Sequence, residues 1–154
     1  MAECYIEYDT ADNYTQEYYR IFAQDNEVKV YDILFNYHFS EPMTEEDNQK
    51  NKDKRMNEFK DIKGVSYEVH TQPYMVSERI IFKYDEADFK ELYDLGFAVS
   101  DDGSVPTFIS FEATLNDLKS EMDCQDYVDN EASYFNKLVF GYDMEYGANQ
   151  QMLP

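Results

Sequence analysis

The chain has 154 residues, of which 43% are hydrophobic, so it is long enough for one domain with a real core and too apolar to be fully disordered. No apolar run approaches the roughly 20 residues that are needed to span a bilayer. The 33 acidic and 13 basic residues give a net charge of −20, which argues against binding to nucleic acid or to an anionic membrane and favours a basic partner or a cation-rich setting.

The first forty residues are rich in β-branched and aromatic types, which favours strands. We expect a short strand over residues 3–8 and a second over residues 18–24. Asp25-Asn26 is a plausible two-residue turn into a long strand over residues 28–39, because both residue types tolerate positive φ. The odd-numbered residues of that long strand are the more apolar ones from residue 31 onward, so this side is expected to face the core.

A helix is predicted next, with Thr44 as its N-cap and Asp47 in an imperfect capping box. Its buried face is marked by apolar residues at a spacing of three, namely Met56, Phe59 and Ile62. Gly64 can take the left-handed conformation that ends the helix. The first half of the helix is entirely polar, so we expect it to project past the sheet and to pack only from Met56 onward.

Alternation predicts two further strands, over residues 65–70 and 80–84, joined by a turn around Pro73. Asp85 is expected to cap a short helix with Phe89, Leu92 and Leu95 facing inward. Residues 105–111 predict an edge strand, and Thr114 with Asp117 predicts the start of a last helix. Residues 136–142 add a possible final strand. The predicted fold is one α+β domain over residues 1–154, a mainly antiparallel sheet of five to six strands packed by two or three helices.

Two stretches of this pattern are similar to a known family. The run F-K-D-I-K-G-V-S-Y-E-V-H, followed by E-R-I-I-F-K-Y-D-E-A-D-F-K-E-L-Y-D-L-G, resembles the YehR-like family of small bacterial lipoproteins, which carry a domain of unknown function. The resemblance covers about residues 20–122 and rests on the K-G-V turn with Tyr84, Ala87 and Asp88. It implies a scaffold over that range, followed by an acidic, tyrosine-rich extension over residues 123–154. It also implies one candidate role, a cell-envelope domain that binds an unknown ligand or cation.

The N-terminal stretch differs from that family's pattern of a signal peptide and a lipid-carrying cysteine. No basic segment followed by an apolar one is visible, and Cys4 follows M-A-E, which is not a lipobox. Cys4 and Cys124 share no C-x-x-C spacing, so we interpret them as two reduced thiols, with a single disulfide between the chain ends as the alternative. These features favour the cytoplasm of a bacterial host.

No catalytic, metal or cofactor site is predicted. Asp85, Glu86 and Asp88 suit helix capping, and Asp101-Asp102-Gly103 lacks the spacing of a calcium loop. His38 and His70 have no further ligands at a metal-binding spacing, and the sequence contains no phosphate-binding or nucleophile motif. We therefore expect a non-catalytic binding protein without a cofactor.

The charge and the interleaving of tyrosines with acids favour an acidic inhibitor as the leading hypothesis. Such a protein mimics nucleic acid and occupies the basic groove of a host nuclease, and this composition resembles that of phage anti-CRISPR or anti-restriction proteins. The expected partner is a basic nucleic-acid-binding protein, with no direct contact to nucleic acid or membrane. Tyrosine adds large amphipathic area to an interface at low entropic cost. The predicted partner-binding residues are Tyr14, Glu17, Tyr18, Asp123, Asp126, Tyr127, Asp129, Glu131 and Tyr134.

Overall fold

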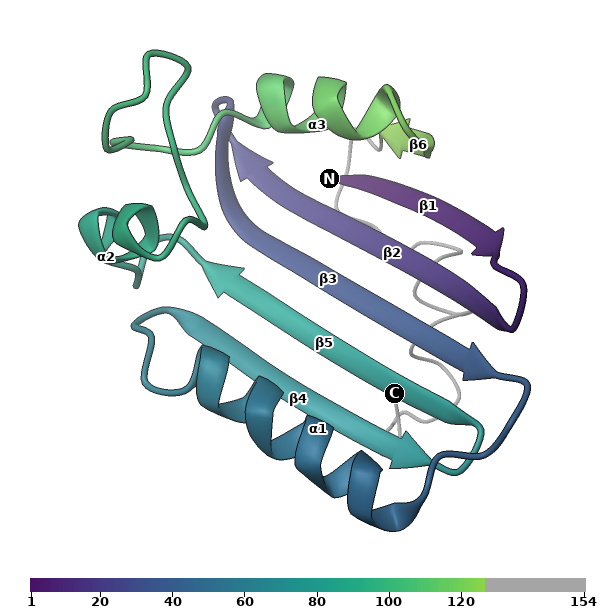
Figure 1. Ribbon diagram of the computed structural model, residues 1–154. Coiled ribbons are helices and arrows are strands. Elements are labelled where there is room, and N and C mark those ends of the chain that lie inside the picture. The colour runs from purple at the N-terminus through teal and green to yellow at the C-terminus, as the bar shows by residue number, and fades with distance from the viewer. Residues whose placement is uncertain (127–154) are drawn as a thin grey trace. The chain divides into compact units, whose positions relative to one another are not determined.

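The computed structural model describes residues 1–126, and the compact unit within them is Ala2–Gln125 (Figure 1). Its six strands lie in one sheet in the order β4-β5-β3-β2-β1-β6. The strands are β1 (Ala2–Asp9), β2 (Asn13–Gln24), β3 (Glu27–Phe39), β4 (Val65–Gln72), β5 (Met75–Lys83) and β6 (Asp123–Asp126). The pairs β1–β2, β2–β3, β3–β5 and β4–β5 are antiparallel. The predicted α+β fold is confirmed.

Three helices cover one face of this sheet, which we call the helix face. They are α1 (Glu45–Phe59), α2 (Phe89–Asp94) and α3 (Phe111–Lys119). Figure 1 shows α1 running along β4 and α3 near β1, in agreement with the contacts between these elements. The main core lies between the helices and the sheet, where Ile21, Phe59, Ile80, Phe82 and Leu92 are buried together.

The central hairpin forms as predicted. Asp25 and Asn26 take φ values of 52° and 64°, as a two-residue turn between twisted antiparallel strands requires. The odd-numbered side of β3 faces the helices, with Tyr31, Ile33 and Phe35 packed against the core. β2 begins at Asn13, five residues earlier than expected, because it gains backbone partners from β1 on one side and from β3 on the other.

The prediction for α1 is right at its start and wrong in its middle. Thr44 caps the helix, and its hydroxyl accepts a hydrogen bond from the backbone N–H of Asp47 at 3.1 Å. The polar first half does not project past the sheet, because Asn48 is buried and only 7% exposed. Met56, the expected first packing residue, is 42% exposed instead. The helix ends at Phe59, and the buried Ile62 belongs to the turn that follows it.

Later elements also begin at residues other than those predicted. Asp88, not Asp85, caps α2 and accepts hydrogen bonds from the backbone N–H groups of Lys90 and Glu91. Leu95 lies at the C-cap of α2 and is exposed rather than inward-facing.

The predicted strand over residues 105–111 does not form, apart from a single bridge from Ser110 to Glu27. Ser110 instead caps α3, which therefore begins three residues before Thr114.

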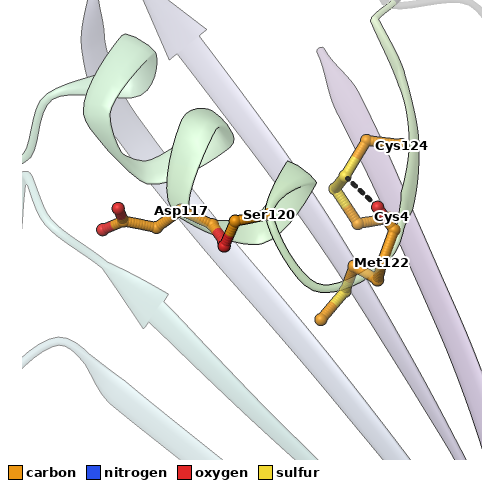
Figure 2. The surroundings of a disulfide bond; sticks show 5 residues. All are labelled: Cys4, Asp117, Ser120, Met122 and Cys124. Atoms are coloured by element: carbon orange, nitrogen blue, oxygen red, sulfur yellow. Dashed lines mark hydrogen bonds between the residues drawn. A yellow bond between two sulfur atoms is a disulfide. The ribbon is translucent and has the colours of Figure 1, made fainter.

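A disulfide joins the two cysteines, so the interpretation as reduced thiols is wrong and the alternative is correct (Figure 2). Cys4 on β1 and Cys124 on β6 have Cα atoms 4.1 Å apart on neighbouring strands. Leu115 of α3 is buried beside Cys4, with Met122 packed against the same cluster. The disulfide therefore holds the short strand β6 at the edge of the sheet. The predicted strand over residues 136–142 lies outside the described residues.

Candidate ligand pocket beside α1

The predicted partner-binding residues in β2 do not share one surface. Successive side chains of a strand point to opposite faces of the sheet. Glu17 and Tyr19 therefore lie on the helix face, where the Tyr19 hydroxyl donates to Glu17 at 2.6 Å. Tyr14 and Tyr18 lie on the opposite face. The structure thus separates Glu17 from the two tyrosines that were grouped with it.

The remaining predicted residues belong to the C-terminal part of the chain. Asp123 is exposed at the start of β6, and Asp126 ends that strand. The others lie outside the described residues: Tyr127, Asp129, Glu131 and Tyr134. Whether they form one acidic surface stays a prediction.

Several tyrosines near the chain start bind neighbouring carboxylates within the sheet. The hydroxyls of Tyr5 and Tyr14 both donate to Glu7 on the opposite face. These two hydrogen bonds stabilise the charged form and lower the pKa of Glu7 below its usual value. On the helix face, Tyr8 donates to Glu17 at 2.6 Å. The interleaved tyrosines and acids therefore form intramolecular pairs along β1 and β2.

A pocket opens on the helix face between the first half of α1 and the strands β3, β4 and β5. Its volume is about 260 Å³. Its apolar walls come from three strands and the loop before α1: Tyr37, Phe39, Met43, Val69 and Val76. Residues with polar side chains from α1, β4 and β5 also border it, almost entirely through their apolar atoms: Asn48, Asn51, Lys52, Arg55, Thr71 and Glu78. A concave, mainly apolar cavity is the usual form of a small-molecule site.

The helix supplies the pocket with polar side chains on the face where a core helix usually carries apolar ones. Asn48, Lys52, Arg55 and Phe59 are spaced by four, three and four residues, so they form one stripe along α1. Phe59 at the end of this stripe stacks on Tyr67, with ring centroids 4.8 Å apart. The apolar contact anchors the end of the helix, and the polar residues before it lie over the pocket.

Arg55 and Glu78 form a partly buried ion pair in the lining. The Arg55 Nε lies 2.7 Å from Glu78, whose side chain is only 6% exposed. Tyr67 donates its hydroxyl to the same carboxylate. Burial and the bond to Glu78 both raise the pKa of Tyr67, so this phenol stays protonated as a donor. Glu78 is therefore held in place by a guanidinium group and a phenol from different elements.

Asn48 carries a buried polar atom without a partner. Its Nδ2 donates to the backbone carbonyl of Gln72 at 3.4 Å, which fixes the orientation of the amide, because a carbonyl can only accept. The Oδ1 atom is buried and has no hydrogen-bond partner. A buried acceptor without a donor costs about 1–3 kcal/mol.

Tyr37 adds a phenol to the apolar wall. Burial raises the pKa of Tyr37 to about 12, and the neighbouring carboxylates of Glu78 and Glu17 act in the same direction. Tyr37 is therefore neutral at physiological pH and offers the pocket an aromatic face rather than a negative charge.

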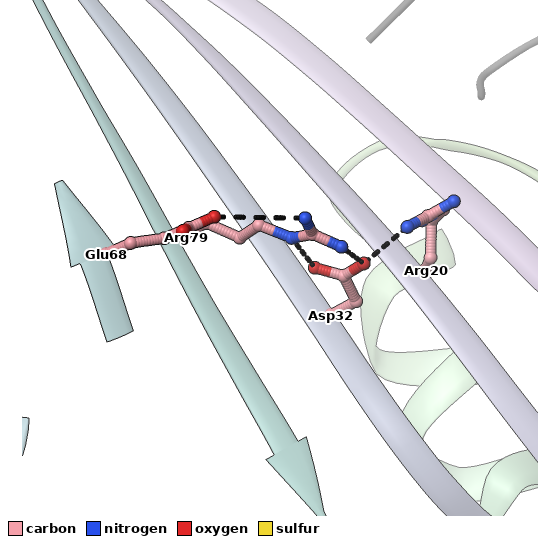
Figure 3. Close-up of polar contacts among 4 residues, drawn as sticks. All are labelled: Arg20, Asp32, Glu68 and Arg79. Carbon is pink, nitrogen blue, oxygen red and sulfur yellow. Dashed lines mark hydrogen bonds and ion pairs between the residues drawn. The ribbon is translucent and has the colours of Figure 1, made fainter. Parts of the chain in front are cut away.

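Other polar clusters have structural explanations. On the opposite face, Asp32 lies between Arg20 and Arg79, and Arg79 also approaches Glu68 (Figure 3). Burial alone would raise the pKa of Asp32, but the two guanidinium groups outweigh it and hold the pKa below its usual value. This network neutralises a buried charge within the sheet.

The turn and the histidines singled out in the sequence also have ordinary surroundings. Asp102 accepts a hydrogen bond from the backbone N–H of Ser104 at 3.0 Å, which is a turn contact. His38 lies 3.2 Å from Gln16, and His70 is exposed.

Within residues 1–126, no three His, Cys, Asp or Glu side chains form a group that could hold a metal ion. In the same range, no helix has the length and apolar character of a membrane span.

Reasoning from the sequence missed this pocket. The signal was present in α1, where Asn48, Lys52 and Arg55 share the helical spacing that leads to Phe59. A polar stripe on the same helix face as a core phenylalanine indicates that this part of the helix does not pack on the hydrophobic core. The apolar walls could not be assigned in the same way, because they come from segments far apart in the chain.

The comparison with solved structures agrees with this fold, whereas the comparisons of sequence found no match. No protein-family model matches the sequence, and no curated protein sequence matches it. Among solved structures, the chain is similar to the NMR structure of the E. coli YehR protein, with a TM-score of 0.58 and 15% sequence identity. The match covers 86% of this chain and 94% of that chain. The resemblance to YehR that the sequence predicted is therefore confirmed at the level of the fold.

Proposed function

We propose that this protein is a non-catalytic binding domain of the bacterial cell envelope that holds a small ligand in the pocket beside α1. The observation that carries the proposal is the cavity itself, about 260 Å³ between α1 and the strands β3, β4 and β5, with an almost entirely apolar surface. Concave, mainly apolar cavities are the usual form of small-molecule sites.

Two further observations support the compartment. Structural disulfides persist in oxidising environments such as the bacterial periplasm and are rare in the cytosol. The Cys4–Cys124 bond thus favours the envelope over the cytoplasm. The fold is also similar to that of YehR, whose family the sequence resembles. The proposal takes up the alternative role stated from the sequence.

The experiment is a ligand screen by native mass spectrometry, with the oxidised full chain incubated in a small-molecule extract of bacterial envelopes. Val76→Phe fills the pocket from β5, and Ser66→Phe adds the same side chain to an exposed position of β4 on the opposite face. We expect a bound species with the wild type and with Ser66→Phe that is absent with Val76→Phe. Identical spectra for all three proteins would refute the pocket as the binding site.

A second candidate is the acidic inhibitor, and the observation that favours it is the net charge of −20. The negative charge of the protein attracts a basic partner. Salt limits the range of this attraction to about 8 Å at physiological ionic strength. Under this proposal, charge reversal at Asp123, Asp126 and Asp129 weakens capture of a basic protein, and reversal at Glu45 and Glu46 has less effect. A pull-down with and without nuclease treatment, at low and high salt, tests it. Capture that does not change with salt concentration would rule out an acidic inhibitor that binds through its charge.

A further inference from the structure

The polarity and the size of the pocket beside α1 restrict the chemical class of its ligand, and this inference therefore rests on the proposed function. We propose that the pocket takes an uncharged hydrocarbon group of up to about ten carbons, the alkyl end of a small amphiphile whose polar end stays in water. The alkyl group lies against Tyr37, Phe39, Val69 and Val76, on the walls that β3, β4 and β5 supply.

The polarity argument starts from the ion pair in the lining. The surface of the cavity is almost entirely apolar, although Arg55 and Glu78 both border it. Arg55 donates to Glu78 at 2.7 Å and to Glu58 at 3.1 Å, and Glu78 also accepts the hydroxyl of Tyr67. The charged groups of this pair are therefore bound to protein partners, and the pair offers the cavity mainly its apolar atoms.

Two further residues of α1 also contribute apolar atoms. The Nδ2 atom of Asn48 donates to the carbonyl of Gln72 at 3.4 Å, and its Oδ1 atom has almost no accessible surface. Lys52 is half-buried, and a lysine in such a place lays its methylene stem along apolar surface and keeps its ammonium group in water. The polar stripe of α1 thus borders the cavity with stems rather than with polar groups.

This lining discriminates against a ligand group that needs hydrogen bonds. A hydroxyl, an amide or a charge inside the cavity would lose its hydration without gaining a partner, which is strongly unfavourable. Water meets the same limit, because a buried water molecule needs several polar partners. A hydrocarbon group loses nothing of this kind and gains from leaving water. The apolar surface therefore selects a hydrocarbon.

The volume limits the length of this group. An apolar cavity of about 150 Å³ takes one benzene molecule. By the same ratio, the cavity of about 260 Å³ has room for about ten carbons. It is too small for a whole phospholipid and suits the end of one alkyl chain. Because the pocket opens on the helix face, a polar end or a longer chain extends into solvent.

The first test measures chain length by NMR titration of the ¹⁵N-labelled, oxidised full chain. The probes are alkyl maltosides from hexyl to dodecyl, which are uncharged amphiphiles, each used below its critical micelle concentration. We expect the affinity to rise about fourfold per added methylene, the factor for burying one such group, up to about decyl. Dodecyl maltoside should then bind no more than about twofold more tightly than decyl maltoside, with shifts at the amides of α1 and β5. Affinity that does not depend on chain length would overturn the inference.

The second test measures polarity with a matched pair of small probes. We expect 1-octanol to bind at least about tenfold more tightly than octane-1,8-diol, because the diol carries a second hydroxyl into a cavity that cannot pair it. Equal binding of the two probes would overturn the apolar class.

Three variants place the alkyl group. Val76→Phe fills the cavity and should weaken decyl maltoside at least about tenfold, whereas Ser66→Phe, at an exposed position on the opposite face, should retain it. Val76→Ala enlarges the cavity, so dodecyl maltoside should now bind more tightly than decyl maltoside. A length limit that neither Val76 variant changes would place the alkyl group elsewhere and overturn the inference.

The outcomes separate this inference from the proposed function. Equal binding of octanol and the diol, abolished by Val76→Phe, would overturn the hydrocarbon class and leave the pocket as a binding site. Absence of binding by all maltosides and by octanol would overturn the inference. If no species in the envelope extract depends on Val76 either, the proposed function fails too.

Discussion

Gly64 lies directly against the backbone of Ala87, so that a Cβ at Gly64 would come within 2.7 Å of the Ala87 nitrogen and 2.8 Å of the Lys83 carbonyl oxygen. The Lys83 N–H also donates to the Gly64 carbonyl at 2.7 Å. These residues belong to the two stretches on which the resemblance to the YehR-like family rests. Their combination in the sequence therefore has a physical reason, because the K-G-V turn and the segment before α2 pack on each other.

Replacing Gly64 should destabilise the fold more than replacing a glycine of similar conformation elsewhere. Gly64 has φ of +78°, and Gly103 has φ of +83° with nothing within 4 Å of an added Cβ. Gly103→Ala should cost about 1–2 kcal/mol, the price of the left-handed conformation alone. Gly64→Ala adds a backbone clash, so we expect a larger loss, about 2–4 kcal/mol. Urea denaturation of both variants checks this, and equal losses would contradict the close approach.

Substitution of Phe59 or Phe82 by alanine should lower the folding stability more than substitution of a histidine. Phe59 and Phe82 are 7% and 6% exposed, and both rings lie within 6 Å of the Phe97 ring centroid. Truncation of a buried phenylalanine to alanine costs about 3–5 kcal/mol. His70→Ala, at an exposed strand position, should stay within about 0.5 kcal/mol of the wild type. Thermal melts of the three variants decide it, and a His70 variant less stable than Phe59→Ala would overturn this assignment of the core.

Acid should unfold the protein partly through Asp32. The two guanidinium groups hold the folded pKa of Asp32 below its usual value, so its ion pairs contribute their full stability above the unfolded pKa and lose it as the pH falls through the folded pKa. Asp32→Asn should lose about 3–5 kcal/mol at pH 7, because it leaves Arg20 and Arg79 beside a neutral amide. Its stability should then decline less steeply than that of the wild type below about pH 4.

Urea unfolding at a series of pH values between about 7 and 2 measures both effects. Glu45→Gln, at an exposed position of α1, is the matched control and should follow the wild-type curve. If the stabilities of the wild type and Asp32→Asn fall in parallel through the acid range, Asp32 does not cause the pH dependence of stability.

Reduction of the Cys4–Cys124 bond should lower stability. The bond closes a sequence separation of 120 residues, and a disulfide across a long loop typically contributes about 2–5 kcal/mol by limiting the unfolded chain. A Cys4→Ser, Cys124→Ser double variant should unfold at a lower denaturant concentration than the oxidised wild type. Addition of a reductant should bring the wild type to the same midpoint and leave the variant unchanged. A wild-type midpoint that resists complete reduction would contradict a structural role.

The local elements were predictable because their signals lie close together in the sequence. Strand alternation in β3, the positive φ values of Asp25 and Asn26, and the Thr44 cap of α1 each depend on a few neighbouring residues. The start of α3 was not predictable in this way. The backbone of Asn26 accepts from the Phe111 N–H at 2.9 Å, and its side chain accepts from the Glu112 N–H at 2.8 Å. A turn much earlier in the chain thus contributes to where that helix begins.

By itself, the sequence determined the fold class, the main strands and the first helix start, since these follow from periodicity and short-range contacts. The likeness to YehR came from the resemblance of two stretches to that family. Only the tertiary structure decided the pairing of Cys4 with Cys124, because two strands at opposite ends of the chain had to become neighbours. Only it placed Asn48 and Lys52 over Val76 to form a pocket. It also divided Glu17 from Tyr14 and Tyr18 between the two faces of one strand, a consequence of the pleat that composition does not reveal.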